Sequence, residues 1–200
     1  MPPQVMSPKF LLVLVLVTIC SAGLGAAGYH YTLSQPVPGK VEGNTDPFIS
    51  EFSDYKKWTL VNPEPVLMEL AAATDCVLVP GRTEDSPHTH KYISVFVNPT
   101  GRAAMMTQRN PRFPPGSMIV KEKLSSKDSK MPEVLTAMLK HEPGYNRESG
   151  DWEYLVLDGT ASRIEGRGKL ANCQGCHVAY KHSDFVTRTY LPREVVQKLN

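Results

Sequence analysis

The residues whose types and spacing carry the clearest chemistry lie near the C-terminus, in the stretch Cys173-Gln174-Gly175-Cys176-His177. Cys-x-x-Cys-His is the attachment pattern of c-type haem. Two thiols add to the two vinyl groups of one porphyrin, and the imidazole that follows binds the iron. On a helix, Cys173 and Cys176 lie on the same face, three residues apart. The pattern therefore predicts one covalently bound haem c, with His177 as its axial iron ligand.

Three other uses of the two cysteines stay open at this stage. They could form a disulfide with each other, act as a thioredoxin-like redox pair, or supply half of a zinc site. A zinc site needs two further converging ligands, and the sequence has no second Cys-x-x-Cys. A redox pair is expected near a βαβ pattern, which we do not find in the sequence. Covalent haem is the favoured interpretation.

The first 27 residues have the pattern of a bacterial-type export signal. A short segment with one cation, Lys9, precedes an apolar run over 10–19, and small residues follow as far as Ala27. Cleavage after Ala27, retention as a membrane anchor and lipidation of Cys20 are the three alternatives. Each of them exports the rest of the chain, and we expect a periplasmic or otherwise exported protein, which is where c-type haem is normally attached.

Composition indicates one domain behind a linker. Residues 28–47 are rich in proline, glycine and polar side chains and predict a linker, whereas 48–200 is long enough for a domain with its own core. The 22 basic and 20 acidic residues give a formal charge of +2, which does not suggest binding to nucleic acid. Cys76 lies in an apolar stretch and is interpreted as a small buried hydrophobic residue.

Hydrophobic periodicity predicts an α+β fold: an antiparallel β-sheet domain with flanking helices, in which a C-terminal helix carries the haem c motif. The expected helices are 47–57, 66–73, 101–108, 169–181 and 194–199, and the expected strands are 91–97, 118–124, 134–141, 152–157 and 185–191. Residues 134–141 also fit a helix. A strand is favoured there because the sheet needs a partner between the neighbouring strands.

The position of the motif argues against an ordinary electron-transfer cytochrome c, in which the motif comes early and a methionine far downstream binds the iron. Only 23 residues follow His177, and none of them is methionine. His182 lies on the same predicted helix as His177, so it cannot reach the opposite side of the haem. A sixth ligand, if there is one, must come from upstream, and an open sixth position is favoured.

Several blocks of the sequence, in their order, resemble the cytochrome P-460 family and its close relative cytochrome c′-beta. The resemblance covers roughly residues 48–192. It rests on the blocks Tyr55-Lys56-Lys57-Trp58, 91–99, 116–124, Gly150-Asp151-Trp152-Glu153-Tyr154 and the C-terminal motif 173–177.

What the resemblance implies is an antiparallel sheet domain, usually a homodimer, with one pentacoordinate haem c. Family members with the cofactor of that name oxidise hydroxylamine and carry an extra lysine-to-porphyrin cross-link; if this chain is such an enzyme, we expect its electrons to leave to a soluble acceptor. The c′-beta relatives lack the cross-link and bind nitric oxide in an apolar distal pocket lined by phenylalanine. The sequence is therefore expected to encode a hydroxylamine-oxidising haem protein, a gas-binding cytochrome or, as a third class, an electron carrier.

Three further residues follow from this resemblance. Glu122 lies where the cross-linked enzymes carry a pocket carboxylate, and a base there would take protons from hydroxylamine; the alternative is a surface ion pair with Lys121 or Lys123. The cross-linking lysine is expected in the strand 91–97, where Lys91 is the only lysine. Phe96, near the middle of that strand, is the alternative: the distal cap of an apolar gas-binding pocket.

Overall fold

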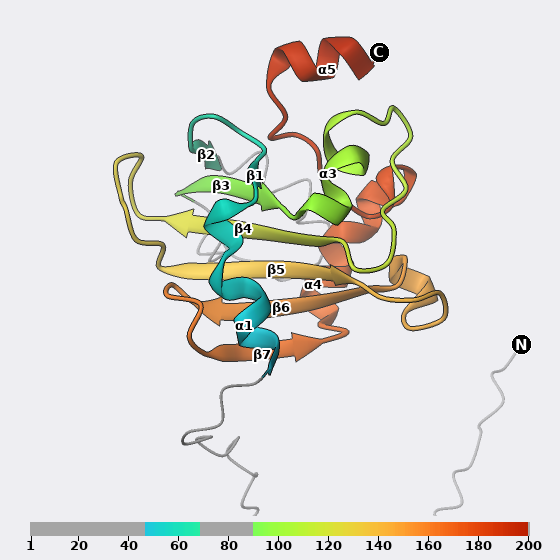
Figure 1. Ribbon diagram of the computed structural model, residues 1–200, viewed down its shortest axis with the longest axis horizontal. Helices are drawn as coiled ribbons and strands as arrows, with labels where there is room; N and C mark the ends of the chain where they lie inside the picture. Colours follow the sequence, from blue (N-terminus) through green and yellow to red (C-terminus); the bar gives the residue numbers. More distant parts are fainter. Residues whose placement is uncertain (1–46, 69–89, 200) are drawn as a thin grey trace, which may run out of the picture. The chain divides into compact units, whose positions relative to one another are not determined.

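An antiparallel β-sheet runs through the part of the chain that the computed structural model describes, residues 47–68 and 90–199 (Figure 1). Within these residues seven strands pair in the order β1-β3-β4-β5-β6-β7, and β2 also pairs with β3. The strands are β1 (Thr59–Leu60), β2 (Val66–Met68), β3 (Lys91–Val97), β4 (Met118–Leu124), β5 (Val134–Lys140), β6 (Trp152–Asp158) and β7 (Ile164–Gly168).

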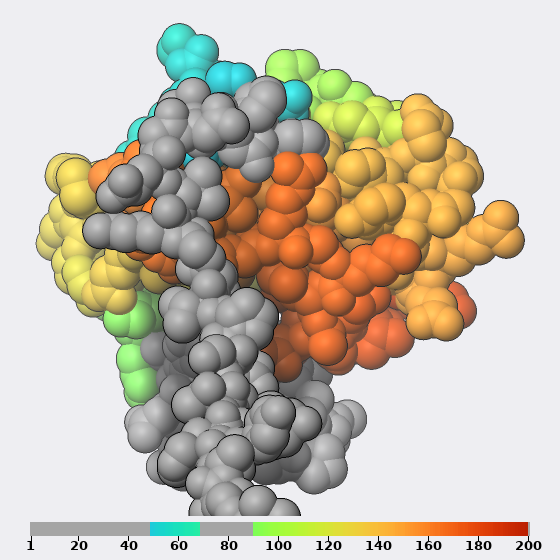
Figure 2. All heavy atoms as spheres, turned by 90° about the horizontal axis from the view of Figure 1, so that it is seen from below, coloured from blue at the N-terminus to red at the C-terminus, as the bar shows by residue number. Residues whose placement is uncertain are grey.

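Helices and 3-10 turns lie at the ends of the described chain and between strands. They are α1 (Pro47–Ser53), η1 (Tyr55–Lys57), α3 (Pro99–Met106), η2 (Arg147–Ser149), α4 (Ala171–His177), η3 (Val178–Ser183) and α5 (Arg193–Leu199). In Figure 1, α1 crosses the front of the sheet and α4 lies behind it. β7 forms one edge, and Figure 2 views the molecule from that side, with orange residues of this part of the chain at the surface.

The middle strands are apolar on both faces, because successive side chains of a strand point to opposite sides. On one side Ile93, Val95 and Ile119 pack with Phe185 and Val186; we call this the His177 face, since Cys173 also packs against it. The other is the Tyr55 face. Its core is made of buried side chains from the strands, packed against Phe52 and Tyr55 of α1 and η1. Burial on both faces explains why the strands read as nearly continuous apolar runs.

The α+β fold with an antiparallel sheet is confirmed, and so are most of the expected elements. The predicted helix 47–57 appears as α1 followed by η1, and the helical turns at 101–108 and 194–199 appear as α3 and α5. The ambiguous segment 134–141 is a strand, β5, which pairs with both β4 and β6. The haem-motif helix is shorter than predicted, because α4 gives way to the 3-10 turn η3 after His177.

One predicted element is wrong, and another is wrong over 66–68, its remaining residues 69–73 lying outside the described part of the chain. Residues 66–68 of the predicted helix 66–73 form the strand β2 instead, since pairing with β3 outweighs the helix propensity that the alanines suggested. The predicted strand 185–191 is not a strand. The chain turns at Asp184 and Phe185, which both have positive φ, and the segment then packs its side chains on the His177 face without joining the ladder. The sequence also gave no expectation for β7, whose two glycines weaken a strand pattern.

The described residues contain no helix with the length and apolar character needed to span a bilayer. The predictions for the export signal over 1–27 and for most of the linker over 28–47 fall outside the described residues, as do those for Cys20 and Cys76.

Candidate haem site

The helix α4 carries the motif as the sequence predicted. It starts after Leu170, whose carbonyl accepts hydrogen bonds from the backbone N–H groups of Cys173 and Gln174, each at 3.0 Å. Cys173 and Cys176 are therefore separated by about one helical turn. Both are half-buried, and His177 ends the helix beside them. This arrangement places two thiols and an imidazole along one short stretch of surface.

The hydrogen bond of His177 leaves one ring nitrogen available for a metal. Its Nδ1 lies 2.7 Å from the carbonyl oxygen of Phe185. A carbonyl oxygen only accepts, so Nδ1 carries the proton and donates, which leaves the lone pair on Nε2. Burial lowers the pKa of His177 to about 4, and the positive charge of Lys121 acts in the same direction. The imidazole is thus neutral near pH 7, in the tautomer that binds iron through Nε2.

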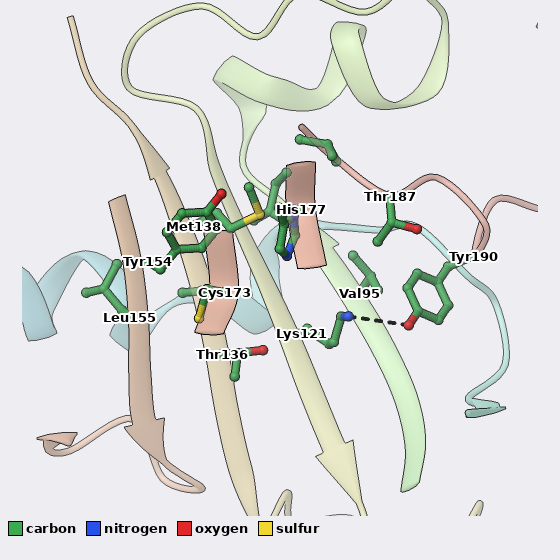
Figure 3. A pocket seen from close by; sticks show the side chains of 13 residues that line it. Val95, Lys121, Thr136, Met138, Tyr154, Leu155, Cys173, His177, Thr187 and Tyr190 are labelled. Carbon is green, nitrogen blue, oxygen red and sulfur yellow. Dashed lines mark hydrogen bonds between the residues drawn. The ribbon is translucent and has the colours of Figure 1, made fainter. Parts of the chain in front are cut away.

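Three adjoining cavities surround the motif. The first lies between α4 and the sheet and is lined by His177, Cys173 and Lys121 together with apolar side chains of β3 to β6 (Figure 3). The second, of about 170 Å³, is lined by His177, Lys121 and Cys176. The third, of about 700 Å³, is also lined by Cys173. Shared lining residues make the three one region, mostly apolar and of the size that accommodates a cofactor.

Lys121 is the residue at this region that sequence reasoning missed. Its Nζ lies 3.3 Å from the hydroxyl oxygen of Tyr190 and 5.0 Å from the centre of that ring. Figure 3 shows the pair on one side of the cavity, with Cys173 and Tyr154 on the other. Strand alternation could have found it: Ile119 and Lys121 share a face, and Ile119 lines the same cavity. From the sequence alone, Lys121 is interpreted only as a surface partner of Glu122.

Glu122 does not reach this region. It follows Lys121 in β4 and therefore points to the opposite, Tyr55 face of the sheet. Its carboxylate accepts a hydrogen bond from the Tyr55 hydroxyl at 2.6 Å and pairs with Lys56 Nζ at 3.2 Å. Burial, the hydrogen bond to Glu122 and the carboxylate charge all raise the pKa of Tyr55 well above its usual value. The expected pocket base is thus a buried carboxylate with its own partners, separated from His177 by the sheet.

Phe96 lies on the same Tyr55 face. It packs in the cluster with Phe52 and Tyr55, and its ring meets the Tyr55 ring edge-on at 5.3 Å between centroids. The expected role as distal cap is therefore corrected as well: the sheet stands between Phe96 and His177, and the β3 side chain that faces the first cavity is that of Val95.

Lys91 is placed at the rim of the third cavity, which Cys173 also lines. Its Nζ is 2.6 Å from Glu133, and its side chain is 28% exposed. It stands at the first residue of β3, whereas Lys121 stands in the middle of β4 and lines both cavities that His177 lines. Of the two lysines, Lys121 is the one that the fold brings to His177.

The zinc alternative finds no completing ligands in this part of the molecule. Within 47–68 and 90–199, no three or more His, Cys, Asp or Glu side chains gather in a way that could hold a metal ion.

Comparison with known proteins gives one positive finding. Residues 53–188 match the family model described as Cytochrome P460; the match covers more than half of the chain and includes Cys173, Cys176, His177 and Lys121. No curated protein sequence matches the chain.

Proposed function

The chain belongs to the cytochrome P460 family of c-type haem proteins, and from this premise we propose that Cys173 and Cys176 hold one haem covalently, with His177 as its axial ligand. The observation that supports the proposal is the convergence of both thiols, a neutral imidazole with a free Nε2 and an adjoining apolar cavity. These residues fit the group in kind and in placement, since c-type attachment needs two thiols and a following histidine.

We propose further that the protein oxidises hydroxylamine or a related small nitrogen compound. A haem iron with an open coordination position supplies the binding site for such a compound and accepts its electrons. The chain's own contribution is a cavity wall of Val95, Ile119 and Met138, which excludes water, and Lys121, whose side chain lies at the edge of that cavity. A soluble electron acceptor would take up the electrons that the substrate releases.

The position of Lys121 favours this activity over gas binding. The resemblance to the family associates hydroxylamine oxidation with a lysine-to-porphyrin cross-link, and Lys121 lines both cavities that His177 lines. Nitric oxide binding is associated with a phenylalanine-lined pocket, and Phe96 lies across the sheet from His177. We therefore assign the cross-linking role to Lys121 in place of Lys91.

One optical spectrum of the reduced protein tests this assignment. A cross-linked haem gives a broad, strongly red-shifted Soret band, and an ordinary pentacoordinate haem c does not. We expect the red-shifted band in the wild type, an ordinary band in Lys121→Met, and no change in Lys91→Met, the matched control at the rim of the third cavity. An ordinary band in the wild type would refute the cross-link and favour the gas-binding alternative.

An electron carrier remains the third candidate, because Met68 is buried and lines the second cavity together with His177. A thioether bound to iron would give a low-spin ferric haem, whereas an open position gives a high-spin one. Electron paramagnetic resonance of the oxidised protein separates the two cases. We expect the high-spin signal; a low-spin signal that disappears in Met68→Ala would establish the carrier.

We also propose that the protein is exported and forms a homodimer. The N-terminal sequence pattern supports export, and the resemblance to the family supports the dimer. Cell fractionation with N-terminal sequencing of the mature chain tests the first, and light scattering of the purified holoprotein tests the second.

A further inference from the structure

The turn that follows η3 has an unusual backbone. Asp184 has φ of 57° and Phe185 has φ of 64°, so two successive residues with side chains lie in the left-handed region. This region is disfavoured for any residue with a Cβ, and more so for a bulky one such as phenylalanine. Such a conformation persists only where the surroundings hold it in place, and it is concentrated at functional sites.

The Asp184 carboxylate provides the strongest of these constraints. Lys140 Nζ lies 2.8 Å from both of its oxygens, and the backbone N–H of Phe113 donates to Oδ2 at 2.8 Å. The side chains of Lys140 and Asp184 are only 11% and 9% exposed. Lys140 also lies over the ring of Trp152, at 5.1 Å from its centre. A buried ion pair of this kind is a weak source of stability, because desolvation of both charges offsets their attraction.

Further contacts fix the turn at its backbone. The indole Nε1–H of Trp152 donates to the Asp184 carbonyl at 2.8 Å, and the Phe185 N–H donates to the Tyr180 carbonyl at 2.8 Å. The Phe185 ring fills the space above Gly150, where an added Cβ would come within 2.5 Å of the ring. The turn is therefore held from β5, from β6 and from the loop before β6.

This turn positions one carbonyl group, that of Phe185, toward His177. The Phe185 oxygen points at His177 and accepts the Nδ1–H bond at 2.7 Å. A hydrogen bond to the second nitrogen of a metal-binding imidazole fixes its ring orientation and raises its basicity. The strained turn thus sets the hydrogen bond of His177 Nδ1, which helps to orient the ring beside Tyr154 and affects how strongly Nε2 can donate to a metal.

We propose that Lys140 and Asp184 are positioning residues for the axial histidine: their buried ion pair holds the Asp184–Phe185 turn so that the Phe185 carbonyl orients His177 and strengthens its bond to iron. This rests on the proposed role of His177 as the axial ligand. Neither Lys140 nor Asp184 is among the lining residues of the three cavities, and the ion pair acts through the turn. Its function is to keep the reduction potential of the haem low and its proximal bond strong.

The test uses the holoprotein and three readouts other than activity. Asp184→Asn keeps an acceptor for the Phe113 N–H and tolerates positive φ, but it loses the charge that binds Lys140. We expect the ferrous iron–histidine stretching mode, measured by resonance Raman, to move to lower frequency, and the potential to rise. Exchange of the His177 Nδ1 proton with solvent, measured by proton nuclear magnetic resonance, should become about tenfold faster as the hydrogen bond weakens.

A matched control separates positioning from general destabilisation. Glu153 is equally buried and paired, with Arg167 and His141, but it lies on β6 facing away from His177. Glu153→Gln should lower the melting temperature and leave the stretching mode and the exchange rate unchanged. If Asp184→Asn behaves in the same way as this control, Asp184 has only a structural role and the inference is overturned.

Two additional variants keep the outcomes distinct. Lys140→Arg preserves the ion pair and should retain the wild-type stretching mode. Lys140→Met removes the charge of the partner and should show the lower frequency expected of Asp184→Asn. It therefore replaces Asp184→Asn as the test if that variant gives no folded holoprotein. His177→Ala tests the premise: an unchanged iron–histidine mode in that variant would refute the axial role of His177 itself. Loss of the mode in His177→Ala, combined with unchanged modes in Asp184→Asn and Lys140→Met, would overturn the positioning inference alone.

Discussion

Lys121 and Glu122 are neighbours in β4, but they belong to two different regions of the molecule. Lys121 points to the His177 face, where it lines cavities next to the Cys-x-x-Cys-His helix. Glu122 points to the Tyr55 face, where the Tyr55 hydroxyl and Lys56 surround its carboxylate. Because successive side chains of a strand point to opposite faces, Lys121 lies at the candidate reaction site and its neighbour Glu122 lies in a packing contact.

The difference shows that burial of an ionisable residue does not by itself identify a functional site. Glu122 is 5% exposed and has a strong hydrogen-bond partner, as an active-site base would. What distinguishes the His177 face is open volume beside the groups that do chemistry, with Lys121, Cys173 and His177 all at the boundary of that volume. The predictions below change one face at a time.

The largest effect is expected from Cys173→Ala combined with Cys176→Ala. The two thiols are the proposed thioether sites, so covalently held haem should be lost, apart from any fraction retained by a lysine link. Haem staining after denaturing electrophoresis measures this loss. Adding Lys121→Met to the double variant should remove any haem that the lysine link still holds. Glu122→Gln, on the other face, should stain like the wild type. Full staining of the triple variant would contradict the assignment of all three residues.

His177→Ala comes next in size. Loss of the imidazole should remove the ferrous iron–histidine mode and shift the ferric optical spectrum, because the axial nitrogen determines spin state and potential. His182, exposed in η3 five residues later, provides the control: His182→Ala should leave both spectra unchanged. If His182→Ala also removed the mode, the axial ligand would have been misassigned.

The sequence predicted the local elements better than it predicted which face each side chain occupies. The strands over 91–97, 118–124 and 152–157 followed from β-rich composition, and the motif helix followed from the spacing of Cys173, Cys176 and His177. Face assignment failed for Glu122 because both faces of β4 are buried around it, so burial did not tell which face holds the cavities. Alternation within a strand tells which residues share a face, but only long-range pairing tells which face receives the haem helix.

The failures at 66–68 and 185–191 have the same origin. At 66–68, the alanine content of the surrounding segment favoured a helix, but these residues pair with β3 and join the sheet. The second has the composition of a strand, and the turn at Asp184 and Phe185 prevents it from pairing. Hydrogen bonds from Phe113 and Trp152, remote in sequence, help to hold that turn. No local pattern reveals such partners.

A middle-sized effect is expected on the Tyr55 face. Glu122→Leu leaves the buried Tyr55 hydroxyl without its acceptor, which should cost about 1–3 kcal/mol in the free energy of unfolding. Chemical denaturation of the holoprotein measures this. Glu122→Gln keeps an acceptor and should lower the free energy of unfolding by less. Hydroxylamine turnover in Glu122→Gln should stay within about twofold of the wild type. Loss of a catalytic base, by contrast, typically lowers the rate by 10²–10⁴-fold. A fall in turnover of that larger size would show that Glu122 takes part in catalysis.

The smallest expected effect is a pH dependence of the free energy of unfolding, caused by Glu153, a charged residue of β6. Burial alone would raise the pKa of Glu153, but hydrogen bonds and positive charge from Arg167, together with the hydrogen bond to His141, outweigh it and hold the pKa below the usual value. The Arg167 and His141 nitrogens lie 2.8 Å and 2.7 Å from its carboxylate oxygens. A carboxyl group whose pKa is lower in the folded than in the unfolded protein stabilises the fold at a pH above its unfolded pKa.

That stabilisation should be present at pH 7 and disappear as the pH falls from the ordinary glutamate pKa, about 4.3, through the lower value in the folded protein. Glu153→Gln cannot titrate, so the wild type should lose its stability advantage over this variant across that acidic range. Urea denaturation of both holoproteins at neutral and acidic pH measures the difference. An advantage that stays constant or grows on acidification would show that Glu153 is not held ionised by Arg167 and His141, and that its burial dominates instead.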